Sequence, residues 1–105
     1  MSTKARRSKA LRILEDLSGG PLSLGEMLRS IREGEEISQV EFAAQLAISK
    51  SHLCDIEKGR KAVSVSRAIE FAEQLGYSKD QFACLALQSQ LDQAGLRFRV
   101  AIIAA

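Results

Sequence analysis

Cysteine, histidine and long apolar runs are scarce in this sequence, and each scarcity excludes a class of protein. The two cysteines, Cys54 and Cys84, lie 30 residues apart, a spacing that fits neither a disulfide framework nor a zinc site. No apolar run reaches the roughly 18 residues of a membrane span, and the basic N-terminus lacks the apolar region of a secretory signal. We therefore expect a protein of the reducing cytoplasm that does not contact a membrane.

The residue types that carry catalysis or bind metals are equally sparse. His52 is the single histidine, and no Cys, Asp or Glu pattern with metal-ligand spacing accompanies it. The sequence also lacks a paired nucleophile and base and a glycine-rich phosphate loop. An enzyme is therefore the least favoured class, and we expect no metal and no cofactor. A chain of 105 residues is instead typical of one binding domain with short tails.

The charge is distributed unevenly, although the net charge is only +2. Residues 1–14 carry +5 and residues 50–67 carry +3, whereas residues 15–49 carry −5 and residues 68–105 carry −1. A localised basic segment binds a polyanion even when the whole chain is near neutral. The basic arm within residues 4–12 is either a solvated tail or an arm that contacts phosphates or the minor groove.

Apolar periodicity and capping residues predict a mainly α-helical chain. A short helix is expected first, followed by five more, at residues 9–17, 24–34, 38–46, 50–58, 65–75 and 78–94. Four serines stand where N-caps are expected: Ser38, Ser49, Ser64 and Ser78. Ser38 forms a capping box with Glu41, and Gly59 closes the helix at 50–58.

The segment Leu96–Ile102 alternates apolar and polar residues with period two, which predicts a β-strand. A lone strand leaves its backbone groups unpaired, so we expect it to pair with a second copy or with a partner's sheet. The helix at 78–94 also carries a second apolar stripe, on which Cys84 is expected to pack as a small hydrophobe. The predicted dimer interface is Leu87, Leu91, Leu96, Phe98, Val100 and Ile102. A frayed tail is the alternative.

The helices at 38–46 and 50–58 are the most informative part of the chain. Two short capped helices joined by a tight turn form a helix-turn-helix, in which the second helix enters the major groove of DNA. Phe42, Ala43 and Leu46 face inward on the first helix, and the small Ala43 lets the two helices approach closely. The outward residues of the second helix are Lys50, Ser51, His52, Cys54, Asp55 and Lys58.

Across residues 24–82 the sequence resembles the lambda-repressor-like, or Xre-type, helix-turn-helix family. The shared elements occur in order and at the family's spacing: Leu28, Arg29 and Arg32; Ser38 and Gln39; Ala43; Ile48 and Ser49; Ile56, Glu57 and Gly59; Ala72, Leu75 and Gly76. The resemblance implies a five-helix DNA-binding domain. We therefore divide the chain into a basic N-terminal arm with a short helix (1–21), the DNA-binding domain (22–82) and a C-terminal segment with a dimerisation strand (83–105).

The resemblance also implies roles for individual residues. Base contacts are expected from Lys50, Ser51, His52, Cys54 and Asp55. Phosphate contacts are expected from Gln39, Ser49, Lys58, Arg60 and Lys61. Arg32 and Glu57 are expected to form a partly buried ion pair that ties the first helix of the domain to the recognition helix. The chemistry of the side chains agrees, because lysine donates to guanine O6 and N7 and basic residues replace counterions on phosphates.

Two positions depart from the family's pattern, and one residue has a second interpretation. Asp55 stands where many relatives have a basic or amide side chain, so it either accepts from a cytosine or is turned away toward Lys58. Glu36 stands where relatives often have glycine, so the turn there is expected to differ. Cys54 is expected to be an exposed small residue, with a redox switch as the less favoured interpretation.

These features predict a sequence-specific DNA-binding transcriptional regulator, a repressor that binds a palindromic operator as a homodimer. Its expected partners are double-stranded DNA and a second copy of the chain. The alternative is the antitoxin of a toxin–antitoxin pair that represses its own operon, in which the terminal segments would bind a toxin protein.

Overall fold

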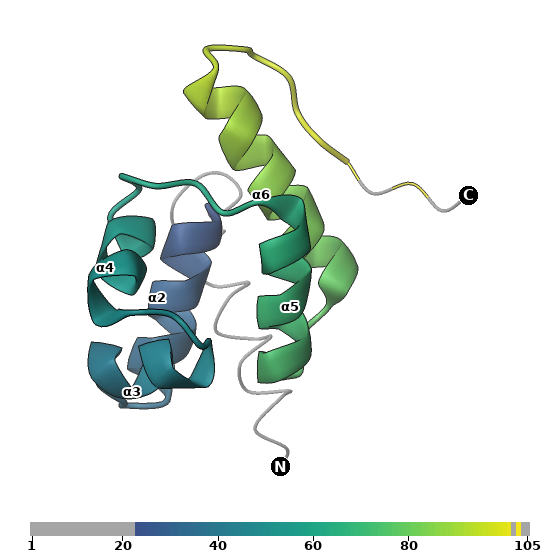
Figure 1. Ribbon diagram of the computed structural model, residues 1–105. Helices are drawn as coiled ribbons and strands as arrows, with labels where there is room; N and C mark the ends of the chain where they lie inside the picture. The colour runs from purple at the N-terminus through teal and green to yellow at the C-terminus, as the bar shows by residue number, and fades with distance from the viewer. Residues whose placement is uncertain (1–22, 102, 104–105) are drawn as a thin grey trace.

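The computed structural model describes residues 23–101 and residue 103, and within them the chain forms five helices. Their bounds are α2 Leu24–Gly34, α3 Gln39–Gln45, α4 Lys50–Glu57, α5 Val65–Leu75 and α6 Lys79–Gln93. They agree with the five predicted segments to within one residue at every end. The helix expected at 9–17 lies outside the described residues. In Figure 1, α2, α3 and α4 form one side of the domain, and α5 and α6 form the other.

Each of the five helices begins at a serine that satisfies a free backbone donor. The Oγ atoms of Ser23, Ser38, Ser49, Ser64 and Ser78 accept from the backbone N–H three residues later, at 3.1–3.2 Å. The first N–H groups of a helix have no partner within the helix, so each serine stabilises its helix by about 1 kcal/mol. The four predicted N-caps are confirmed. The start of each helix is therefore determined by residues that are close to it in the sequence.

One apolar core holds the helices together. Phe42 of α3, Phe71 of α5 and Phe82 of α6 are completely buried. Leucine and methionine side chains of α2 belong to the same core. Helix α5 packs against α6, and α2 contacts both α4 and α6. The predicted inward residues Ala43 and Leu46 are buried as well. The core lies beneath α3 and α4 and leaves their outer faces free.

The turn between α3 and α4 depends on a left-handed residue. Ala47 has a φ of 58°, and Ile48 N–H then reaches back to the carbonyl of Ala43 at 3.0 Å. This arrangement ends a helix and redirects the chain within one residue. Glu36 ends α2 in the same way, with a φ of 57°. The sequence predicts a different turn here, because Glu36 stands where relatives often have glycine. The glutamate nevertheless adopts the left-handed conformation that favours glycine.

Replacing Ala47 by glycine is expected to raise the free energy of unfolding by about 1 kcal/mol, because a Cβ in the left-handed region costs roughly 1–2 kcal/mol and glycine has none. Ala44→Gly is the matched control. Ala44 is also exposed but lies inside α3, where glycine costs about 1 kcal/mol. Urea denaturation of both variants measures the difference. Two changes of the same sign would contradict the assignment of the turn.

The predicted β-strand at Leu96–Ile102 is wrong for the described part of the chain. Residues 96–101 have no regular secondary structure and run back beside α6 (Figure 1). The side-chain amide of Gln88 donates to the carbonyl of Phe98 at 2.7 Å and accepts from Val100 N–H at 2.7 Å. The Cys84 thiol donates to the carbonyl of Val100 at 3.5 Å. A strand needs a second strand beside it, and here a single amide pairs with the extended segment instead.

Within residues 23–101 and 103, no helix is long and apolar enough to cross a bilayer.

Candidate nucleic-acid interface

Helices α3 and α4 form a helix-turn-helix whose inner side is fixed by burial. Ala43 of α3 and Leu53 and Ile56 of α4 are at most 2% exposed. Because these side chains anchor both helices on the core, the opposite side of α4 must face outward. Lys50 and Ser51 are exposed on that side, and His52, Cys54 and Asp55 are half-buried. The expected base-contacting residues therefore lie on the outward half of one short helix.

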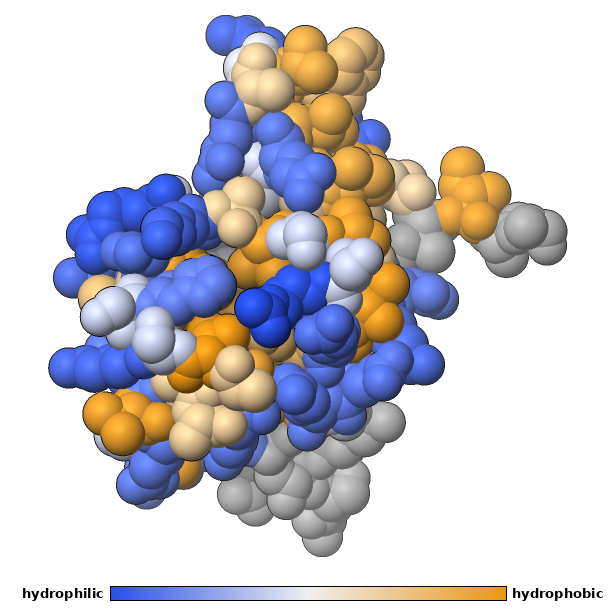
Figure 2. All heavy atoms as spheres, viewed as in Figure 1, coloured by the Kyte–Doolittle hydropathy of each residue, from blue (hydrophilic) through white to orange (hydrophobic). Residues whose placement is uncertain are grey.

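A surface hollow of about 290 Å³ gathers most of these residues in one place. It is lined by Gln39 from α3, by side chains of α4 and by the loop that follows, and we call it the α4 hollow: Gln39, Lys50, Ser51, Cys54, Asp55 and Arg60. His52 does not line it. The exposed cations Lys58 and Lys61 and the N-cap Ser49 lie outside its lining. In Figure 2 the side of the molecule that carries α4 is largely hydrophilic.

Asp55 pairs with the loop after α4. Arg60 Nε donates to Asp55 Oδ1 at 2.9 Å, and Lys61 Nζ lies 4.0 Å from Oδ2. The hydrogen bond to Asp55 raises the pKa of the Arg60 guanidinium. Two roles are expected for Asp55. The predicted interaction with Lys58 is wrong, because Asp55 pairs with Arg60 instead. A contact to a cytosine stays a prediction.

The end of α4 explains why residues five apart meet. Gly59 has a φ of 76°, as expected for the glycine that closes this helix. The backbone N–H of Arg60 then reaches the carbonyl of Asp55 at 2.8 Å. This left-handed glycine cap folds the chain back over the last turn of α4. It brings the Arg60 side chain to the face that carries Asp55.

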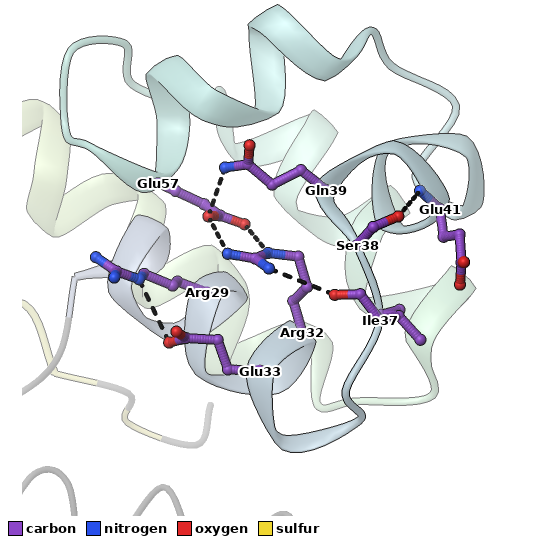
Figure 3. Close-up of polar contacts among 8 residues, drawn as sticks. All are labelled: Arg29, Arg32, Glu33, Ile37, Ser38, Gln39, Glu41 and Glu57. Atoms are coloured by element: carbon purple, nitrogen blue, oxygen red, sulfur yellow. Dashed lines mark hydrogen bonds and ion pairs between the residues drawn. The ribbon is translucent and has the colours of Figure 1, made fainter.

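A buried ionic network fixes α4 against α2 and α3 (Figure 3). Arg32 donates to both carboxylate oxygens of Glu57, with Nε–Oε2 at 2.9 Å and Nη2–Oε1 at 3.0 Å. Gln39 Nε2 also donates to Glu57 Oε1, at 3.1 Å. The Glu57 side chain is 3% exposed and that of Arg32 is 16% exposed. Two parallel N–H···O bonds set both distance and orientation, so the network fixes α4 relative to both neighbouring helices.

The network has an electrostatic consequence for Arg32. The hydrogen bond to Glu57 and the proximity of the carboxylate raise the pKa of the guanidinium, against the opposing effect of burial. Arg32 therefore stays charged at any pH the folded protein meets. Its third contact, from Nη1 to the carbonyl of Ile37 at 3.4 Å, reaches the turn before α3.

Sequence reasoning missed a close approach between α2 and α4. A Cβ built on Gly25 would overlap the carbonyl oxygen of Ile56, and it would lie 3.4 Å from the Cα of Glu57. The first turn of α2 therefore rests directly on the backbone of the recognition helix. The signal in the sequence was a glycine next to the buried Leu24 in the first turn of a helix, where a larger residue would otherwise be expected.

Comparison with known proteins agrees with this geometry. A family model described as helix-turn-helix matches residues 28–82, which is 55 of the 105 residues. The chain belongs to the Xre-type, lambda-repressor-like helix-turn-helix family. No match was found among curated proteins or among solved structures.

Membership of the Xre-type family supports the function of a DNA-binding transcription regulator. The match extends from Leu28 in α2 to Phe82 in α6, so it includes α3, α4 and the ionic network. Most of α6 and the C-terminal segment lie beyond it. Within the described residues, no group of three His, Cys, Asp or Glu side chains could hold a metal ion.

The expected dimer residues lie in the segment beyond the family match. Leu87, Leu96 and Phe98 are 41%, 45% and 65% exposed, and we call them the α6 patch. Leu91 and Val100 are half-buried, and Ile102 lies outside the described residues. In Figure 2, apolar side chains follow α6 toward the end of the molecule away from α3. Large apolar side chains that are exposed to solvent can mark a protein interface when they adjoin one another.

Proposed function

We propose that the protein is a sequence-specific transcriptional repressor that binds a palindromic operator as a homodimer, with α4 of each copy in the major groove. The observation that carries the proposal is the α4 hollow, because it groups a lysine and a hydroxyl of the rigidly held α4 with an amide of α3 and an arginine of the following loop. These are the groups that recognise base edges and phosphates. A dimer bound to an operator would repress transcription by blocking access to the promoter. We place this activity in the cytoplasm, where the DNA lies.

Lys50 and Ser51 are proposed to contact bases, because both are exposed in the first turn of α4. His52, Cys54 and Asp55 lie beside them. Phosphate contacts are assigned to residues that surround the hollow: Gln39, Ser49, Lys58, Arg60 and Lys61. The free N–H groups at the start of α4 add a positive dipole end that attracts a phosphate.

Changing Lys50 and Ser51 together to alanine is expected to abolish the preference for the operator. Each lost base contact costs about 1–3 kcal/mol of discrimination, whereas the phosphate contacts that remain preserve weak binding to any duplex. Titration of labelled operator and scrambled DNA at one salt concentration measures both affinities. The matched control is Lys79→Ala with Ser66→Ala, exposed positions on α6 and α5. Equal weakening on both DNAs would refute the base contacts.

The homodimer is proposed to form across the α6 patch, since Phe98 and Leu96 expose apolar area outside the DNA-binding domain. Phe98→Asp, or truncation after Ala94, is expected to yield monomers in sedimentation equilibrium and to weaken operator binding strongly. A buried unpaired carboxylate is costly. Val40→Asp is the matched control for the sedimentation measurement, because Val40 is an exposed apolar residue of α3 that is 61% accessible and lies outside the patch. Truncated or Phe98→Asp chains that remain dimeric would contradict this interface.

A partner protein is the second candidate for the α6 patch, and it corresponds to the antitoxin function. The favouring observation is that the patch lies beyond the segment matched by the family. Sedimentation of the pure wild-type chain separates the two candidates. A dimer that Phe98→Asp disrupts supports self-association. A wild-type monomer that forms a stoichiometric complex with the product of a neighbouring gene supports the antitoxin.

A further inference from the structure

Asp55 places a carboxylate on the face of α4 that would meet DNA, where phosphates repel it. The structure pairs this carboxylate with a cation of the same chain, through Arg60 Nε at 2.9 Å. Arg60 Nη2 also lies 3.8 Å from Cys54 Sγ, in the geometry of a weak hydrogen bond. The guanidinium is thus held at two points on α4, although its side chain is 58% exposed. A side chain that only neutralises phosphates does not need its guanidinium held in one orientation.

The contacts leave the outer edge of the guanidinium available. A guanidinium carries five N–H donors in a fixed plane. Asp55 engages the one on Nε and Cys54 engages one on Nη2. The remaining donors belong to Nη1 and Nη2, and Arg60 lines the α4 hollow beside Lys50 and Ser51. Two adjacent donors on a fixed plane match the O6 and N7 acceptors of guanine.

We propose that Arg60 reads a guanine in the operator half-site and that Asp55 is the positioning residue that holds it in the reading orientation. The proposal rests on the proposed function, because it requires α4 to enter the major groove. It reassigns Arg60 from a phosphate to a base and removes Asp55 from direct contact with cytosine. Lys58 and Lys61, which are exposed beside Arg60, keep the phosphate contacts.

The first experiment is selection of bound duplexes from a random DNA pool by wild-type protein, Arg60→Lys and Arg29→Lys. Wild-type protein is expected to enrich a motif that contains a guanine in each half-site. Arg60→Lys keeps the charge but loses the planar fork, so preference at that base pair is expected to fall about 5- to 150-fold with the rest of the motif intact. Arg29→Lys, the matched control, makes the same change at an arginine of α2 whose side chain is 59% exposed and pairs with Glu33, and it leaves the motif unchanged. A full motif selected by Arg60→Lys would overturn the proposal and leave the proposed function standing.

The second experiment tests the dependence of Arg60 on Asp55 by a double-mutant cycle. Asp55→Ala is expected to weaken preference at the same base pair as Arg60→Lys, and the double variant is expected to lose no more than either single variant. A carboxylate with a purely structural role would lower the melting temperature and leave the motif intact. Additive losses, or a loss at a different base pair, would show that Asp55 reads a base directly and would overturn its positioning role.

A base analogue identifies the contacted atom. Replacing the selected guanine by 7-deazaguanine removes the N7 acceptor and keeps Watson–Crick pairing. Wild-type protein is expected to lose affinity for this duplex, whereas Arg60→Met, which has no donor at this position, is expected to bind both duplexes equally. Equal sensitivity of the two proteins to the analogue would overturn the assignment of Arg60. A wild-type protein that enriches no sequence at all would refute the proposed function and this inference with it.

Discussion

Glu57→Met is expected to lower the free energy of unfolding by about 3–5 kcal/mol, the cost of removing one partner of a buried ion pair. The substitution keeps an unbranched side chain of similar length but leaves the Arg32 guanidinium, 16% exposed, without its two carboxylate bonds. Gln39 loses its acceptor at the same time. Because a small domain is stabilised by only about 5–15 kcal/mol, the loss is a large fraction of the total. Urea denaturation followed by circular dichroism measures it.

The matched variant replaces both partners. Arg32→Met combined with Glu57→Met removes the uncompensated charge, so the double variant is expected to recover most of the stability that each single variant loses. Because the pKa of Arg32 is raised in the folded protein, the protonated side chain stabilises the folded state. This contribution to stability is lost only as the pH rises through the raised pKa. Since that value is strongly alkaline, the loss in Glu57→Met is expected to be the same across the neutral range. A double variant as unstable as the singles would contradict the electrostatic explanation.

Gly25→Ala is the second substitution with a large expected effect. The added Cβ would overlap the carbonyl oxygen of Ile56, and backbone cannot rotate away as a side chain can. Overpacking of this kind costs typically 1–3 kcal/mol, which exceeds the roughly 1 kcal/mol that alanine gains over glycine in a helix. Because α4 must move to relieve the overlap, operator affinity is expected to fall together with stability. Thermal unfolding and a DNA titration of the same preparation measure the two effects.

Gly34→Ala is the matched control for Gly25→Ala. Gly34 is the last residue of the same helix, is exposed, and has no atom within 4 Å of a Cβ built on it. Alanine there is expected to be neutral or to stabilise the protein by up to about 1 kcal/mol, because only helix propensity changes. Operator affinity is expected to stay the same. A gain of stability in Gly25→Ala as large as in Gly34→Ala would refute the close approach of α2 and α4.

Local features of the fold could be predicted from the sequence, because their causes lie within a few residues. Ser38, Ser49, Ser64 and Ser78 were all assigned correctly as N-caps, since capping depends only on a hydroxyl and an N–H three residues later. The helix-turn-helix is a local pattern as well, and the resemblance of residues 24–82 to the Xre-type family is confirmed by the family match over residues 28–82.

Features that depend on the path of the chain through space could not be predicted in the same way. The period-two pattern after Gly95 suggested a strand, but pairing depends on what lies beside the segment, and Gln88 lies there. Helical spacing predicts that Asp55 pairs with Lys58, whereas the left-handed Gly59 brings Arg60 to Asp55 instead. The role of Gly25 depends on contact with Ile56, which is 31 residues away in the sequence. None of these contacts can be predicted from residue spacing within a single helix or strand.

The hydrogen bond from Gln39 to Glu57 has a consequence for the thermodynamics of association. A glutamine that is free in solution loses rotamer entropy when it is immobilised at an interface, at a cost of about 0.5–1.5 kcal/mol. Gln39 is already held at 3.1 Å by a carboxylate that is itself clamped by Arg32. Its ordering is therefore completed during folding, and a contact made by its remaining polar atoms carries a smaller entropic penalty. The network that joins three helices thus also pre-organises a side chain at the edge of the recognition surface.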